Sequence, residues 1–396
     1  MADDAPSIFS LELTTKEQLN RLCQHLWDWK TCENCSHHQP CLLPICSWQR
    51  LSRLEPFFQY YKELAASYVS DAFVPQETPA LRSHEDLLAI IHLINKRPNQ
   101  KRADLVKEYF SSRNGSEEVL SADQQIALNI AVKVLLMMDC TVDGHVGGNF
   151  EMGGEPSVWH RHQSWEEFIS ATFPKRDHPS LDEEDKTAPD IKARLKATKL
   201  KKTAHLSSEG TNDIRNHLRL DQKTGVVEIF HHTTVLKEHL KASKASHYEG
   251  LRPLTALSNV SPRQLALETL DSLQKILFPL DNESRFMLRS LVSKRSFDPD
   301  CLSLEFPSYR LEHERDIKYQ YWGSRLMDLC DEIENPKPRG LIDIWLEQRS
   351  KARHVMLATL VGVIIAIVLG ILGLVVGIFQ AWVAYEAWKH LVNGSS

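Results

Sequence analysis

Cysteine and histidine residues gather near the start of the chain at spacings that zinc sites use. Cys32 and Cys35 form a C-x2-C turn, which commonly supplies two thiolate ligands to a tetrahedral zinc ion. The predicted ligands are Cys32 and Cys35, with two more supplied from among His37, Cys41 and Cys46. Because the later cysteines lack the regular spacing, two interpretations stay open. The segment either binds a structural zinc ion or forms a cysteine-rich apolar loop that packs on the preceding helix.

Two histidine pairs occur farther along the chain, His160 with His162 and His231 with His232. Imidazole nitrogen binds transition metals, so the four residues could assemble a metal-dependent active site from distant segments. Surface or packing roles are the alternative, since no carboxylate or cysteine completes a site beside His232 and His239. Neither does a serine or cysteine stand beside a positioned histidine, as a catalytic nucleophile would. We therefore expect a protein that is not an enzyme, and keep the histidine site as the alternative.

Five glycines lie between positions 144 and 154. Glycine-rich loops that bind nucleotide phosphates end in GK[ST] or follow a strand in G-x-G-x-x-G order. Neither condition is met, because a helical pattern precedes this loop. The stretch is predicted to be a surface loop.

Apolar residues recur at three- and four-residue steps and predict a mostly α, multi-helix domain with little β structure. Ser164 with Glu167 forms a capping box, and Ser261 with Pro262 is a typical N-cap and N1 pair. The best strand candidate is Val226 to Phe230, which follows a turn. Helices are predicted over residues 14–30, 47–72, 84–96, 101–113, 121–139, 262–277, 282–294 and 316–334, with another starting at Ser164.

An uncharged stretch of 25 residues, Val355 to Phe379, lies near the C-terminus. As a helix it would span roughly 37 Å, enough to cross a hydrocarbon core of about 30 Å. We predict a single transmembrane helix, followed by an aromatic belt at Trp382, Tyr385 and Trp388. The chain then divides into a Cys/His-rich segment (1–50), a helical domain (51–335), a basic linker (336–354), the span (355–383) and a short tail (384–396).

Positive charge is concentrated before the span. The basic residues on this side are Lys337, Arg339, Arg349, Lys351 and Arg353, whereas Lys389 follows the span. Because cytosolic flanks carry the excess of lysine and arginine, the N-terminal domain is expected in the cytosol. The acidic start of the chain does not resemble a signal peptide, so we expect tail-anchored insertion. The sequons at Asn114 and Asn282 would then carry no sugar.

Small residues follow one side of the span: Gly362, Ala366, Gly370, Gly373 and Gly377. Gly373 and Gly377 form a GxxxG pair, which lets two helix backbones approach closely. The pattern favours a homodimer or a partner helix, although glycine is also common in membrane helices for other reasons.

Composition narrows the class of partner. The net charge is −5 and the pI is near 6.4, which argues against a nucleic-acid-binding protein. A hydrophobic fraction of 42% suits a globular chain with a real core. The basic stretch from Lys192 to Lys202 follows an acidic run, and either solvates a loop and a helix face or touches anionic lipid. The expected partners are membrane lipid and another protein.

Several blocks of the sequence carry a family resemblance. They are RNHLRLD, VVEIFHH, LKEHL, LFPLD, SFDPDCL and YWGSRLMDLCDEIENPKPRG, followed by the basic linker and terminal span. This arrangement, from about Ala122 onward, resembles a large group of uncharacterised proteins of filamentous ascomycete fungi. Some of these occur in accessory, sometimes subtelomeric regions linked to hyphal surface, colony or biofilm morphology. The resemblance implies no catalytic residue or ligand.

The clear membrane signal and the lack of a catalytic motif favour a cytosol-facing scaffold or interaction module that one C-terminal helix anchors. A fungus-specific determinant of hyphal surface, colony or biofilm morphology, and a metal-dependent enzyme with a histidine site, are the alternatives.

Overall fold

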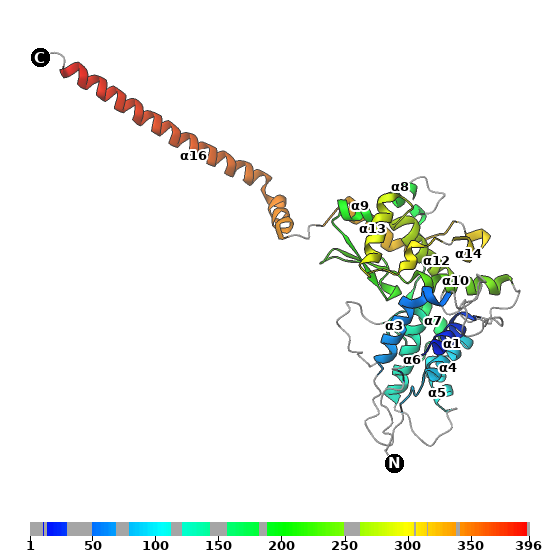
Figure 1. Ribbon diagram of the computed structural model, residues 1–396. Helices are drawn as coiled ribbons and strands as arrows, with labels where there is room; N and C mark the ends of the chain where they lie inside the picture. Colours follow the sequence, from blue (N-terminus) through cyan, green and yellow to red (C-terminus); the bar gives the residue numbers. More distant parts are fainter. Residues whose placement is uncertain are drawn as a thin grey trace. The chain divides into compact units, whose positions relative to one another are not determined.

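The structure is a computed structural model. It describes residues 11, 14–29, 50–68, 79–111, 121–142, 157–181, 188–248, 262–304, 306–314, 316–337 and 341–393. The predicted mostly α fold with little β structure is confirmed (Figure 1). The chain forms two compact units, Met1–Pro336 and Lys337–Ser396. The zinc candidates Cys32, Cys35, His37, Cys41 and Cys46 and the glycine-rich loop lie outside the described residues.

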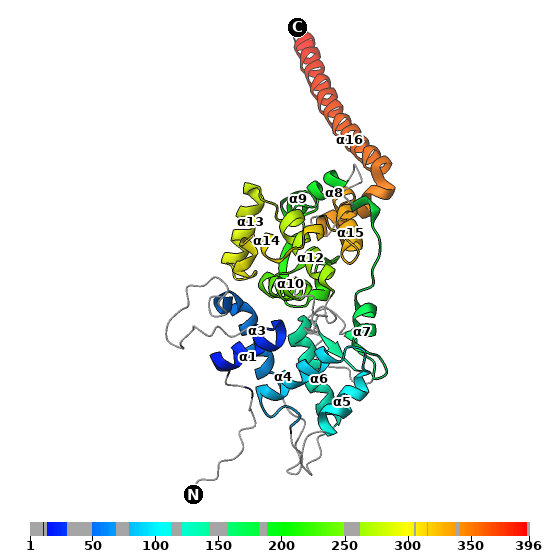
Figure 2. The ribbon, with the colours of Figure 1, turned by 90° about the vertical axis from the view of Figure 1, so that its right-hand side faces the viewer.

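The first half of the larger unit is built around helix α6. Helices α3, α4 and α5 all contact α6 (Figure 2). Ala127, Ala131 and Val132 of α6, which corresponds to the helix predicted over 121–139, are fully buried. The elements are α1 (Lys16–Trp27), η1 (Ser52–Leu54), α3 (Glu55–Ala66), α4 (His84–Lys96), α5 (Arg102–Ser111), α6 (Ser121–Leu136), β1 (Cys140–Thr141), β2 (Ser157–Val158) and α7 (Trp165–Thr172).

The second half combines short helices with a small sheet. Its helical elements are η3 (Pro179–Leu181), α8 (Ala188–Arg194), α9 (Ala197–Thr203), η4 (Ile214–Asn216), α10 (Thr233–Tyr248), α12 (Arg263–Asp271), the π-helical η5 (Ser272–Leu277), α13 (Asn282–Ser293), η6 (Pro299–Leu302), α14 (Phe306–Tyr309), η7 (Glu312–Glu314) and α15 (Gly323–Glu334). Strands β3 (Ser207–Thr211), β4 (Arg219–Asp221) and β5 (Val226–Phe230) form a sheet in the order β3-β5-β4. β5 runs parallel to β3 and antiparallel to β4, and α10 follows β5 directly.

Local signals placed several elements correctly. Thr15 and Ser164 form capping boxes at the starts of α1 and α7. In each, the N-cap side chain accepts from the N3 backbone N–H, and the N3 side chain accepts from the N-cap backbone N–H. The predicted strand Val226 to Phe230 is β5. These features depend on neighbours within a few positions, so they could be read from the sequence.

Three predicted helices have different boundaries in the structure. The helix predicted from residue 316 begins only at Gly323, because the backbone N–H groups of Gln320, Tyr321 and Trp322 donate to the Glu268 carboxylate. Those donors hold residues 320–322 in a loop. The helix predicted over 47–72 is η1 followed by α3, which ends at Ala66. The helix predicted from residue 262 starts at Arg263, with Pro262 rather than Ser261 at the N-cap.

The smaller unit is dominated by helix α16 (Leu341–Asn393), which is 53 residues long. Its stretch Val361–Trp388 has a mean hydropathy of 3.1 and is not covered by any other described part of the chain. This is one helix long and apolar enough to cross a membrane. Helix α16 contains the whole predicted span, Val355 to Phe379, and the aromatic belt that follows it.

Candidate functional site

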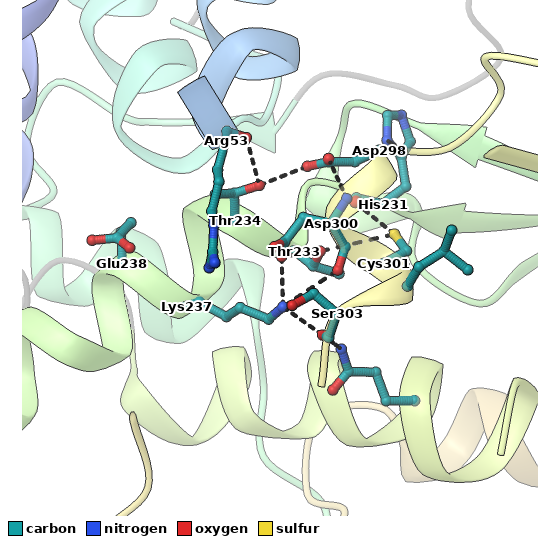
Figure 3. A network of polar contacts seen from close by, with 12 residues as sticks. Arg53, His231, Thr233, Thr234, Lys237, Glu238, Asp298, Asp300, Cys301 and Ser303 are labelled. Carbon is teal, nitrogen blue, oxygen red and sulfur yellow. Dashed lines mark hydrogen bonds and ion pairs between the residues drawn. The ribbon is translucent and has the colours of Figure 1, made fainter. Parts of the chain in front are cut away.

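A cleft of about 1170 Å³ opens in the larger unit, next to the first turn of α10. Three segments far apart in the sequence line it: η1 with the start of α3, the end of β3 with the residues before α10, and the turn from residue 295 to 303. Figure 3 shows the polar side chains that hold these segments together. The cleft is the candidate functional site because it joins open volume to buried charge.

Two threonines at the start of α10 tie the helix to the 298–300 turn. Thr233 donates to Asp300 Oδ2 at 3.0 Å, and Thr234 donates to Asp298 Oδ2 at 2.8 Å (Figure 3). The two carboxylates therefore lie at the positive end of the helix dipole, where negative charge is favourable. Thr234 Oγ1 also lies 3.2 Å from the Arg53 carbonyl oxygen, which connects η1 to the same point.

Lys237 forms a buried ion pair one turn farther along α10. Its Nζ donates to Asp300 Oδ2 at 2.5 Å and to the Ser303 carbonyl at 2.8 Å, and the residue is 1% exposed. An ammonium group bonded in this way is held as a fixed charge rather than offered as a nucleophile. The pair anchors the turn that forms one wall of the cleft.

Asp298 carries a buried carboxylate to which no cation of the described residues is directly bonded. Its Oδ1 accepts from the Asp300 N–H at 2.9 Å, and its Oδ2 accepts from Thr234. Burial raises the pKa of Asp298 to about 6, against the opposing effect of these hydrogen bonds. The carboxylate lines the cleft, so a cation entering there would supply the missing counter-charge.

His231 and His232 line the cleft as a stacked pair, with ring centroids 4.3 Å apart. His231 Nδ1 accepts from the Asp298 N–H at 3.1 Å, and burial lowers the pKa of His231 to about 4. His232 Nε2 lies 2.7 Å from Asn212 Oδ1, which can only accept, so Nε2 carries the proton. Burial holds the pKa of His232 well below its ordinary value. Both rings are neutral near pH 7.

The four histidines considered for a metal site are not brought together as one. His160 and His162 are exposed in the turn between β2 and α7, whereas His231 and His232 precede α10. Across the described ranges, no group of three or more His, Cys, Asp or Glu side chains has the arrangement to hold a metal ion. Cys23, on α1, is buried, and its burial raises the thiol pKa, which disfavours the thiolate that zinc requires.

A serine and a histidine meet at a different place, which sequence reasoning missed. His217 Nε2 lies 2.7 Å from Ser272 Oγ, and both residues are fully buried. His217 Nδ1 accepts from the Phe230 N–H, so Nε2 carries the proton and donates to the serine. Ser272 in turn donates to the Thr269 carbonyl. A general base must accept the serine proton, so the pair has the opposite polarity and acts in packing.

The basic stretch from Lys192 to Lys202 is partly neutralised by the fold. Its pairs are Arg194 with Glu334 at 2.7 Å, Lys196 with Asp281 at 2.9 Å, and Lys202 with Glu283. Three of its charges are thereby directed to α13, to the residue before α13, and to α15. This pairing weakens the interpretation of the stretch as a surface for anionic lipid.

On α16, a Cβ built at Gly362, Gly370, Gly373 or Gly377 would meet nothing within 4 Å. These positions are open in the described structure, as is the rest of the Val361–Trp388 stretch.

No protein-family model, curated protein or solved structure matches the chain, so its functional assignment depends on the geometry described above.

Proposed function

We propose that the protein is a membrane-anchored interaction module, in which α16 sets the location and the larger unit recruits a protein partner through the cleft. One observation carries the proposal. The Val361–Trp388 stretch exposes Ile, Leu and Val side chains along its whole length, with nothing in the described chain to cover them. An apolar surface of this length is stable in lipid and unstable in water.

The larger unit is proposed to face the cytosol. Basic residues cluster before the span, whereas Lys389 is partly offset by Glu386 after it. The positive-inside rule supports this orientation.

The chemistry of the cleft supports binding rather than catalysis. Lys237 is engaged by Asp300 and Ser303, and the two histidines are neutral and packed on one another. Lys237, His231 and His232 are each held by neighbouring polar groups, as residues that shape a recognition surface are.

The glycine face of α16 is proposed as a second contact surface, used either by a second copy of this chain or by a partner helix. Gly373 and Gly377 are one helical turn apart and carry no side chain that would separate two backbones.

The test is mass spectrometry of proteins that co-purify with the full chain in mild detergent. A matched chain would carry an unrelated leucine–alanine span in place of residues 361–388, and a second would carry Gly373→Ile with Gly377→Ile. A stoichiometric partner retained by both variants supports recruitment by the larger unit. A partner lost from both assigns recruitment to the glycine face, and no partner with any chain contradicts the proposal.

A further inference from the structure

Strand β3 lies at an edge of the β3-β5-β4 sheet. Its first residue, Ser207, donates its N–H to the Gly225 carbonyl at 2.9 Å, in parallel register with β5. Successive residues of a strand direct their backbone polar groups to opposite sides. The N–H and C=O groups of Ser208 and Gly210 therefore point away from β5, toward the outer edge of the sheet.

This edge has no partner among the described residues. Neither Ser208 nor Gly210 makes a backbone hydrogen bond there to a described residue, and β5 is the one strand beside β3 in the described sheet. Natural edge strands are commonly protected by proline, lysine, a bulge or a covering helix. β3 has the sequence SSEGT, so its one charged residue is Glu209, and Ser207, Glu209 and Gly210 are exposed. The two residues whose backbone groups face the outer edge, Ser208 and Gly210, carry a small side chain and none, respectively.

The cleft begins where β3 ends. Gly210 and Asn212 line it together with Ser296. A Cβ at Gly210 would lie 2.0 Å from the Ser296 carbonyl oxygen and 2.7 Å from the His231 ring, so glycine is required for the strand to approach the 296 turn this closely. The end of β3 thus borders the cleft, and a chain paired with the outer edge of β3 would end near it.

The charges of the cleft indicate which side chain it would accept. Its lining contains four carboxylates (Glu55, Glu63, Asp298 and Asp300) and two guanidinium groups (Arg53 and Arg295). Asp300 is bonded to Lys237, whereas Asp298 is 3% exposed and is bonded to no cation in the described part of the chain. A buried carboxylate gains most from a charged donor that reaches it in a site shielded from water.

We propose that the outer edge of β3 binds an extended segment of a partner protein as an additional strand, and that a lysine or arginine of this segment enters the cleft toward Asp298. The proposal rests on the proposed recruiting function and specifies its surface and its ligand class. Backbone pairing supplies the affinity, and the basic side chain supplies the specificity.

The test uses the full chain in detergent micelles and a display library of random twelve-residue peptides. Selected peptides are expected to carry a lysine or arginine within an alternating, strand-forming pattern. The decisive variant is Ser208→Pro, matched by Ser208→Ala. Proline removes the outward N–H and is tolerated where a strand N–H faces solvent, whereas alanine keeps that donor. We expect at least about tenfold weaker binding for Ser208→Pro, since a donor is lost and the ring obstructs the edge, and no change for Ser208→Ala.

A peptide-side variant keeps the test independent of folding. Replacing the selected basic residue by norleucine should weaken binding about tenfold, and N-methylation of alternate peptide amides should abolish it. Peptides that bind Ser208→Pro as well as the unmodified chain, or that show no preference for a basic residue, would overturn the proposal. So would the absence of any enriched peptide.

Hydrogen exchange of the Ser208 and Gly210 amides separates two possible occupants. Fast exchange in the isolated full chain, slowed by the selected peptide, supports an external partner. Slow exchange without peptide would mean that another segment of the same chain covers the edge, and would overturn the proposal. If Ser208→Pro still co-purifies the native partner, the recruiting function stands and only the β3 surface is refuted.

Discussion

At the scale of single residues, Lys237 and Asp300 form a buried ion pair beside the cleft. Removing one partner of such a pair leaves the other charge buried without compensation, which typically costs about 3–5 kcal/mol. We expect Lys237→Met to lower the free energy of unfolding by this amount, measured by thermal and denaturant unfolding in detergent. Methionine keeps the length and the apolar contacts of the lysine side chain, so the loss of stability measures the effect of removing the charge.

The double variant Lys237→Met with Asp300→Asn is the control for this prediction. Because it removes both charges, it should recover part of the stability. A loss below about 1 kcal/mol for the single variant would contradict a structural role for the pair.

Glu268 should make stability depend on pH. Burial raises its pKa from 4.5 to about 7 in the folded protein, against the backbone hydrogen bonds from Gln320, Tyr321 and Trp322. Between pH 4.5 and about 7 the folded state therefore binds more protons than the unfolded state. The stability that protonated Glu268 adds to the folded state is fully present below pH 4.5 and is lost as the pH rises through about 7. The loss amounts to about 3 kcal/mol.

The measurement is the unfolding free energy at pH 5 and pH 7.5 for the unmodified chain and for Glu268→Gln. Glutamine does not ionise, so the variant should lose this part of the pH dependence. Glu334→Gln is the matched control, because Glu334 is half-exposed and pairs with Arg194. Equal pH dependence for all three chains would contradict the assignment.

At the scale of elements, the end of α13 shows strain beside the cleft. Arg295 N–H bonds to the Val292 carbonyl and Ser296 N–H to the Leu291 carbonyl, which is the Schellman pattern. Arg295 occupies its left-handed position, with φ of 57°, where glycine is usual. A non-glycine residue there costs roughly 1–2 kcal/mol. A strained arginine retained in the cleft lining supports a role in binding.

Arg295→Gly is therefore expected to stabilise the protein by about 0.5–1 kcal/mol, because relief of strain exceeds the added freedom of glycine in the unfolded chain. The same change should weaken binding of a peptide selected against the cleft. Lys294→Gly is the control. Lys294 has an ordinary φ of −78°, so glycine at this position should destabilise the protein. A lower melting temperature for Arg295→Gly would refute the strain argument.

At the scale of the whole molecule, the orientation of the anchor decides which compartment the larger unit faces. If that unit is cytosolic, the exposed sequon at Asn282 receives no sugar, and an added sequon-bearing extension after Ser396 does. The measurement is a gel-mobility shift with glycosidase treatment after expression in a eukaryotic cell. Sugar on Asn282, without sugar on the extension, would reverse the proposed topology.

Sequence periodicity was sufficient for the features that depend on near neighbours. The apolar span, the capping boxes at Thr15 and Ser164, and strand β5 all follow from residues a few positions apart. The zinc set around Cys32 lies outside the described residues, and the resemblance to fungal proteins stays a prediction.

The cleft could be found only in the tertiary structure, because its walls come from residues near 53, 210, 231 and 298, and no local pattern brings these together. Thr233 and Thr234 bond to Asp300 and Asp298, more than sixty positions away, so no local pattern predicts these contacts. Strands β3 and β4 lack alternating apolar residues and exist because β5 pairs with both. The late start of α15 depends on Glu268, more than fifty residues away. Local free energies decide where helices form, whereas buried charge and strand pairing decide where distant segments meet.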